Sequence, residues 1–444
     1  MKITAIKGGS TAGAGGCLAT KKITLRKTEA SPYPSFKEGI ALSFVLLLAA
    51  SLLAALPLIA QQSDQTGLDP NRLALIPIRM QQFVDKGTVS GVVTLVARHG
   101  QVAELDAVGF TDLETKQPMR VDNIFQIHSM TKPIVAIAAM MLVEEGKLQI
   151  GDPVEKILPE FRGQWVAQSK SAEAMSLRRP SRPITLRDLM THTSGMSTNP
   201  PESIKELHGA LHMPLADVVL VESQQPLDFD PGSKWQYSNT GIAALARVIE
   251  VVSGMPFEKF LDRRIFKPLG MKDTYIFPPK EKHDRMPTAY ILKDGKPVKY
   301  TADPLGEGVL KFREGAKYSL PEGGIYSTAS DLYILYQMML NKGQVSGVRI
   351  LSPESVELMT RVHTGDLMTS QSGAGWGLGW FVMKDTAGTQ SPLSPGTFGH
   401  GGRYGTFCFI DPQKDLIGIF MIHREGGSDE RQAFMALAES SVIE

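Results

Sequence analysis

Three short segments of the chain carry side chains that together could perform acyl transfer. Ser129 and Lys132 lie three residues apart, Tyr237 follows later in the chain, and His400 lies near its end. Positions i and i+3 share one face of a helix, so the Ser129 hydroxyl would lie within reach of the Lys132 ammonium group. A serine is a weak nucleophile until a base accepts its proton, and a lysine can do so only when burial or nearby cations lower its pKa. The pair therefore predicts a nucleophile and its activator.

The element that must hold this pair is a buried helix. An apolar run extends from Pro133 to Val143 and is followed by Glu144, Glu145 and Gly146. Proline in the first turn and glycine after the last turn are typical helix boundaries. At the start of such a helix the backbone N–H groups are unpaired and the dipole favours negative charge. The alternative interpretation is a capping serine with a solvated lysine.

Composition bounds the class of protein. The chain has 444 residues, 42% of them apolar, and a net charge of +1, which suits one large domain or two interleaved lobes. Basic residues are dispersed, so we expect no nucleic-acid partner. The nine histidines show no ligand spacing, and we expect neither a metal nor another cofactor. Nucleophile-elbow, zinc-protease and phosphate-loop motifs are absent from the sequence.

The N-terminal region is typical of an exported protein. Residues 41–60 carry no charge and follow Lys37, as expected for a signal sequence or a membrane anchor. Cleavage near Gln61 and a retained anchor both remain open. We therefore treat residues 1–60 as a leader and expect a periplasmic or extracellular location, with membrane anchoring through residues 41–60 if the leader is kept. The cysteines, Cys17 and Cys408, provide no disulfide framework.

The order of the expected elements predicts an α+β fold. Strands come from both ends of the chain and helices from the middle, which implies one antiparallel sheet built from both termini, flanked by helices, with an inserted mostly helical lobe at about 130–320. Residues 61–71 are expected to be a linker and 72–444 the catalytic domain. Polar stretches at 164–182 and 279–320 are expected to be loops beside a cleft. The clearest patterns are a helix over 72–86, strands over 90–97 and 102–108, helices over 185–190, 215–221, 241–252 and 257–265, strands over 377–383, 405–410 and 416–423, and a terminal helix over 430–442.

These segments, in this order, resemble the class C β-lactamase superfamily, which includes penicillin-binding DD-peptidases and family VIII carboxylesterases. The similarity extends over about residues 70 to 440 and implies a β-lactamase-like fold. The segments that carry it are Ser129-Met-Thr-Lys132, Ile184-Thr-Leu-Arg-Asp-Leu-Met-Thr-His-Thr-Ser-Gly-Met196, Asp230-Pro-Gly-Ser-Lys-Trp-Gln-Tyr-Ser-Asn239, Phe266-Lys-Pro-Leu-Gly-Met271, Gly323-Gly-Ile-Tyr-Ser-Thr328, Trp376-Gly-Leu-Gly-Trp380 and His400-Gly-Gly402.

The resemblance implies a catalytic role for each motif. Ser129 would be acylated, while Lys132 and Tyr237 share the proton transfers in an order that the sequence leaves open. A tyrosine has a pKa near 10, and a cationic Lys132 beside Tyr237 would be expected to lower it. Tyr237 would also protonate the leaving group and later activate the water that deacylates the serine.

Substrate binding is implied for the neighbouring residues. Asn239 would donate its amide to the substrate or hold Lys132, although a helix cap is the plainer interpretation. The oxyanion hole would be the backbone N–H of Ser129 and that of Arg403, which follows Gly401 and Gly402. Tyr237 and His400 have the alternative of purely structural roles.

His400 departs from the family pattern, in which a lysine usually precedes Thr-Gly. A histidine is mostly neutral at pH 7, so attraction for a substrate carboxylate is weaker. This favours a carboxylesterase-like enzyme for small esters or amides. A DD-peptidase or weak β-lactamase is the alternative, and a non-catalytic binder of peptidoglycan or of a protein is a further one. The expected partner is a small-molecule ester, peptide or lactam.

Overall fold

The computed structural model of the 444-residue chain describes residues 66–170, 174–200, 211–300, 315–369, 372–385, 387 and 391–443. The predicted leader at 1–60, the first part of the predicted linker and Cys17 lie outside the described residues. Segments of the two predicted loops, 171–173 and 301–314, lie outside them as well.

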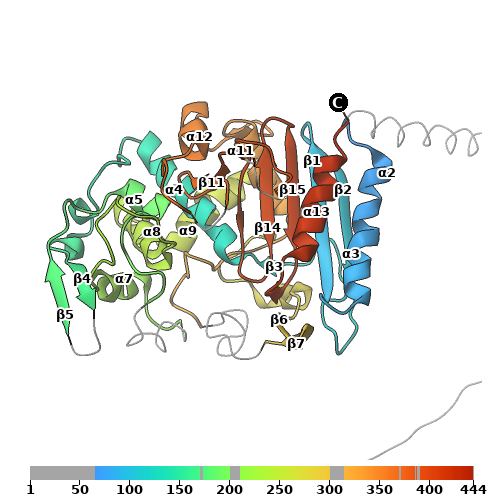
Figure 1. Ribbon diagram of the computed structural model, residues 1–444, viewed down its shortest axis with the longest axis horizontal. Coiled ribbons are helices and arrows are strands. Elements are labelled where there is room, and N and C mark those ends of the chain that lie inside the picture. The colour runs from blue at the N-terminus through green and yellow to red at the C-terminus, as the bar shows by residue number, and fades with distance from the viewer. Residues whose placement is uncertain are drawn as a thin grey trace, which may run out of the picture. The chain divides into compact units, whose positions relative to one another are not determined.

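A seven-stranded sheet, drawn in Figure 1, combines the two ends of the chain, as predicted. Its order is β11-β12-β13-β14-β15-β1-β2, and all neighbours are antiparallel. The first two strands in the chain form a hairpin, and the hairpin pairs with the last strand of the sheet, as in Val93 opposite Met421. The strands are β1 (Gly91–Arg98), β2 (Gln101–Gly109), β11 (Ala374–Trp376), β12 (Phe381–Met383), β13 (Phe398–Gly401), β14 (Phe407–Asp411) and β15 (Leu416–Met421).

Helices from the two chain ends pack together on one face of this sheet. They are α2 (Pro70–Leu73), α3 (Leu75–Asp85) and α13 (Asp429–Ser440), and Figure 1 shows α13 and α3 next to each other. Phe434 of α13 lies 5.6 Å, between ring centroids, from Phe420 of β15. Leu68 is buried and bridges to Val442, so the end of the predicted linker is part of the folded unit.

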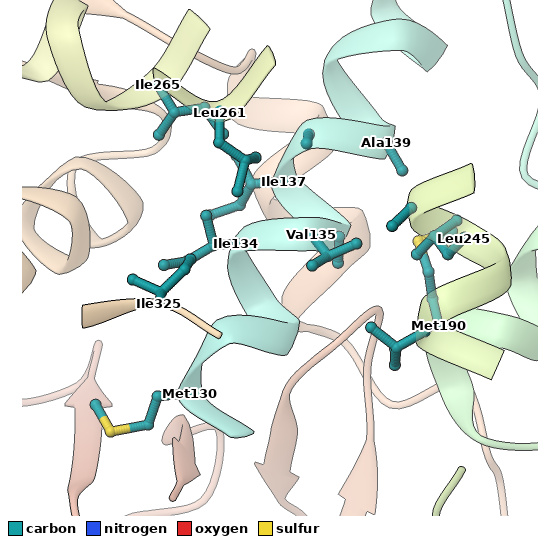
Figure 2. Close-up of a cluster of buried hydrophobic side chains, with 14 of the residues drawn as sticks. Met130, Ile134, Val135, Ile137, Ala139, Met190, Leu245, Leu261, Ile265 and Ile325 are labelled. Atoms are coloured by element: carbon teal, nitrogen blue, oxygen red, sulfur yellow. The ribbon is translucent and has the colours of Figure 1, made fainter. Parts of the chain in front are cut away.

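The other face of the sheet packs against the central helices. The helix that follows Ser129 is α4 (Thr131–Glu144). It is buried along almost its whole length, and α8 (Asn239–Ser253) is one of the helices packed against it. Figure 2 shows Val135 facing Leu245, and Ile134 close to Ile325. The remaining helices are α5 (Leu186–Thr191), α7 (Leu215–Ser223), α9 (Phe257–Leu261), a π-helical turn (Asp262–Phe266), α10 (Lys267–Leu269), α11 (Ala329–Leu340), α12 (Pro353–Thr360) and short 3-10 turns at His128–Met130, Val154–Lys156, Pro159–Phe161 and Lys280–Arg285.

Several expected boundaries are wrong. The predicted loop at 164–182 contains a hairpin, β4 (Val166–Lys170) with β5 (Met175–Arg178), and the predicted loop at 279–320 contains another, β6 (Tyr290–Lys293) with β7 (Lys296–Lys299). Most of their side chains are exposed, so no alternation of apolar residues marks them. The strand expected at 377–383 begins only at Phe381, because residues 377–380 form the turn that joins β11 to β12.

The shorter strands are β3 (Phe125–Gln126), β8 (Tyr326–Ser327), β9 (Gln344–Val345), β10 (Val348–Arg349) and β16 (Arg424–Glu425).

Within the described residues, no single helix has both the length and the apolar composition needed to cross a membrane. The segments Asn239–Ser253 and Phe257–Leu269 reach that length and composition only as a pair, and a bend of 73° separates them.

Candidate active site

Ser129 lies in the 3-10 turn His128–Met130, which runs directly into α4. The Lys132 Nζ donates a hydrogen bond of 3.0 Å to the Ser129 hydroxyl oxygen. The expected face shared by positions i and i+3 is therefore present, and the alternative of a solvated lysine is wrong because Lys132 is fully buried. Ser129 itself remains half-buried and lines a pocket.

Burial controls the charge of Lys132. It lowers the Lys132 pKa from 10.5 to about 7, and the negative charge of Glu322 opposes this only in part. The same Nζ also donates 2.7 Å to the backbone oxygen of Glu322, on the loop before β8. A lysine with a pKa close to 7 is partly neutral at physiological pH, so its amine can accept a proton from serine.

Tyr237 completes the group, and its hydroxyl shares a hydrogen bond with that of Ser129. The Lys132 Nζ lies 4.7 Å from the centroid of the Tyr237 ring, over its face. Burial raises the pKa of Tyr237 above its usual value of 10, and the hydrogen bond from Ser129 opposes this only in part. The expected lowering of the Tyr237 pKa by Lys132 is therefore wrong, because the same buried environment disfavours charge on both groups.

His400 lies on β13 and faces the same pocket. Its Nδ1 donates 2.7 Å to the backbone oxygen of Gly401, which leaves Nε2 as the acceptor, buried and without a partner among the described residues. Burial and the charge of Lys132 lower the pKa of His400 to about 3. His400 is thus neutral at pH 7, as expected from its residue type.

The glycines after His400 bring this strand end against the Ser129 turn. A Cβ on Gly402 would lie 2.4 Å from the Ile127 backbone oxygen, so a side chain is excluded there. The Gly402 N–H donates a hydrogen bond to the Thr406 backbone oxygen. The expected oxyanion-hole donor, the Arg403 N–H, belongs to the next residue. The Arg403 side chain binds Glu425 at 3.1 Å and is not among the residues that line the pocket.

Asn239 lies at the start of α8 and its amide binds a neighbouring asparagine. Its amide donates 3.2 Å to Asn199 Oδ1, so the expected contact with Lys132 is not formed. The alternative of a capping Asn239 is wrong as well, since the Ser238 hydroxyl is the cap of α8 and accepts from Gly241 N–H at 2.9 Å.

A pocket of about 1100 Å³ opens in front of Ser129. Its wall is mixed, with aromatic and aliphatic side chains beside hydroxyl, amide and charged groups, and combines the catalytic segments with β12, β14 and α13. The wall contains Trp376, Phe381, Pro392, Leu393, His400, Phe407, Arg431, Gln432 and Met435.

Arg431 was not found from the sequence. It lies in the first turns of α13, and its guanidinium sits 4.9 Å from the Phe407 ring centroid. Its Nε is buried without a hydrogen-bond partner among the described residues, and burial lowers its pKa. The pocket therefore does hold a cation, which the C-terminal helix α13 supplies in place of position 400. An isolated arginine near the end of the chain offers no sequence signal for this placement.

Aromatic rings around Tyr237 were also missed, although they lie in segments that carry the family resemblance. His192 lies 4.4 Å and Trp376 6.1 Å from the Tyr237 ring, measured between centroids.

No group of three or more potential metal ligands comes together in the part of the chain that the structure describes.

The fold and the group formed by Ser129, Lys132 and Tyr237 define a serine hydrolase. The sequence profile of the family described as Beta-lactamase matches residues 79–441. Esterase EstB from Burkholderia gladioli is 32% identical over 378 residues, which cover 78% of this chain and 90% of the esterase. The chain belongs to the β-lactamase family of serine hydrolases.

Other relatives in this family have different described activities. A putative D-alanyl-D-alanine carboxypeptidase from Escherichia coli K12 is 28% identical, over 86% of this chain and 89% of that protein. The structure of EstCE1, described as a hydrolase with promiscuous acyltransferase activity, superposes with a TM-score of 0.71 at 27% identity. The superposed region covers 84% of this chain and 99% of the EstCE1 chain.

Proposed function

We propose that this protein is an exported carboxylesterase-like hydrolase that forms an acyl-enzyme on Ser129. The observation that carries the proposal is the Ser129 hydroxyl, which lies 3.0 Å from a buried lysine whose pKa is about 7 and lines a large pocket. The nucleophile Ser129, its base Lys132 and a pocket that could hold a substrate therefore lie together.

Acylation begins with proton transfer from the Ser129 hydroxyl to the neutral amine of Lys132. The pKa values favour Lys132 over Tyr237 as this first base, because the pKa of Lys132 is lowered and that of Tyr237 is raised. The serine oxygen then forms a bond to the substrate carbonyl carbon, and the π electron pair of the C=O bond moves to the carbonyl oxygen. The backbone N–H groups of Ser129 and Arg403 stabilise that oxyanion.

Collapse of the tetrahedral intermediate releases the leaving group. The C–O bond breaks, and the Tyr237 hydroxyl passes its proton to the departing oxygen while it takes the proton held by Lys132. In the second half, water attacks the acyl carbon and gives up a proton along the same route. The serine oxygen then leaves and recovers its proton, and a carboxylic acid departs.

An ester preference is supported by the pocket and by two relatives. The neutral His400 and the aromatic side chains in the wall suit an uncharged acyl or alcohol group. EstB and EstCE1 are described as an esterase and a hydrolase. Arg431 favours the second candidate, a DD-carboxypeptidase-like activity on a substrate with a carboxylate, as in the description of the E. coli relative.

Export is supported by the uncharged stretch at residues 41–60. It would direct the chain to the periplasm or beyond, with or without retention as a membrane anchor.

The test combines turnover with covalent labelling. Wild type, Ser129→Ala and the exposed control Ser233→Ala are incubated with p-nitrophenyl butyrate and with a fluorescent penicillin, and intact masses are measured. Ester turnover and an acyl adduct in wild type and in the control, both lost in Ser129→Ala, support the esterase. Stable penicillin labelling without ester turnover supports the carboxypeptidase, and the absence of both contradicts the acyl-enzyme proposal.

A further inference from the structure

His192 contacts the chain on both sides of Tyr237. Its backbone oxygen accepts a hydrogen bond of 2.9 Å from Gln236 N–H. Its ring Nδ1 accepts one of 3.2 Å from Ser238 N–H. One residue therefore accepts hydrogen bonds from the backbone N–H groups of the residues before and after the tyrosine, which restricts both ends of the short segment that carries the phenol.

The His192 ring also supports the Tyr237 ring directly. The two rings are tilted by 37° with 4.4 Å between centroids. Trp376 lies edge-on to the His192 ring at 5.1 Å and Trp235 at 6.0 Å. His192 is fully buried, so this packing leaves little room for the phenol to shift.

The backbone at His192 is held in an unusual conformation. The residue ends α5 with φ 59° and ψ 35°, in the left-handed region that normally favours glycine or asparagine. Strain of this kind persists only where the surroundings enforce it, and it is common at functional sites. In this conformation the His192 ring lies against the backbone of Ser238.

The hydrogen bond also defines the protonation of the ring. Because Nδ1 accepts from an N–H group, it carries no proton, and the neutral ring bears its proton on Nε2. Burial, and to a lesser extent the positive charge of Lys132, lower the pKa of His192, which agrees with a neutral ring.

We propose that His192 is a positioning residue that holds the Tyr237 hydroxyl in register with the Ser129 oxygen. It acts through Tyr237 and touches neither substrate nor the reacting atoms. The inference rests on the proposed function, since it assigns His192 to the proton route of that site. Loss of the ring would let the phenol move, and misplacement by about 1 Å costs about 100-fold in rate.

The experiment compares His192→Gly, His192→Asn and Tyr237→Phe in the full-length chain, with p-nitrophenyl butyrate as substrate. Glycine accepts the left-handed backbone and removes the ring, whereas asparagine accepts the backbone and places an oxygen near the position of Nδ1. The matched control is His99→Gly, because His99 has φ 53° and lies exposed in the turn between β1 and β2.

We expect His192→Gly to lower kcat by about 100-fold, with KM changed less than about threefold. The kcat of His192→Asn should be at least about tenfold higher than that of His192→Gly. His99→Gly should match wild type. In the Tyr237→Phe background, His192→Gly should cost less than about threefold more, since its effect passes through the phenol.

The outcomes separate the two proposals. Full activity in Ser129→Ala or Tyr237→Phe overturns the proposed function. An impaired Tyr237→Phe together with wild-type kcat in His192→Gly overturns the positioning role alone, as does a full further loss in the double variant. If His192→Gly does not fold, His192→Asn and His192→Ala decide: equal rates in these two, whether both low or both normal, overturn the role of the Nδ1 acceptor.

Discussion

Replacing Lys132 by methionine should stabilise the protein while it removes the hydrolase activity. Lys132 is fully buried, and its pKa falls from 10.5 to about 7 because the interior disfavours its charge. The folded protein therefore binds the Lys132 proton more weakly than the unfolded chain does. Methionine has a similar length and carries no charge, so it avoids this cost.

The size of the effect follows from the two pKa values. Each difference of one in pKa corresponds to 1.36 kcal/mol, so the burial of Lys132 costs about 4 kcal/mol at pH 7. Methionine loses the hydrogen bonds to Ser129 and to the Glu322 backbone oxygen, at about 1 kcal/mol each. A net gain of about 2 kcal/mol in the free energy of unfolding should remain.

The pH dependence gives this prediction its sign. Between pH about 7 and 10.5 the unfolded chain holds a proton on Lys132 that the folded chain lacks, so wild-type stability rises with pH across that window. The advantage of Lys132→Met is thus largest at and below pH 7 and fades toward pH 10.5. Its activity on p-nitrophenyl butyrate should fall by at least about 100-fold.

The assay is urea unfolding at about pH 6 and about pH 9, followed by tryptophan fluorescence. The matched control is Lys156→Met, whose lysine is exposed and paired with Asp152 at 2.9 Å, and it should change stability by no more than about 0.5 kcal/mol at either pH. Lower stability of Lys132→Met at pH 6, or an equal effect at both pH values, would refute the reasoning about its buried charge.

Four further outcomes are expected. The kcat/KM for a neutral ester should rise with pH through about 7, because Lys132 must lose its proton to act as the base. His400→Lys should improve reaction with carboxylated β-lactams relative to esters, since it adds a cation to the pocket wall. Arg431→Gln should lower kcat/KM for a carboxylated ester by about tenfold relative to its neutral analogue. Removal of residues 1–60 should leave an active protein, because the described fold begins after them.

Each of these has a result that contradicts it. A pH profile that is flat from about pH 6 to about pH 8 would argue against Lys132 as the base. An unchanged ratio of lactam to ester reaction in His400→Lys would show that position 400 does not face the substrate. Equal losses for charged and neutral esters in Arg431→Gln would assign Arg431 a structural role, and aggregation of the shortened chain would contradict the domain limits.

Several features of the fold follow from local patterns in the sequence. The apolar run after Lys132 predicts the buried helix α4, and strand patterns at both ends of the chain predict the sheet that joins β1 to β15. Such signals are local, because side-chain periodicity reflects which face of an element is buried. The exposed hairpin β4–β5 carries no such signal, and the sequence did not reveal it.

The chemistry of the site depends on contacts between distant segments. By itself the sequence determined the nucleophile, its lysine neighbour and the family motifs, because these are short and contiguous. Only the tertiary structure decided that Lys132 is buried enough to lose its charge, that Arg431 enters the pocket, and that His192 holds both sides of Tyr237. Burial and approach across the fold set these properties, and neither is encoded in the spacing of residues along the chain.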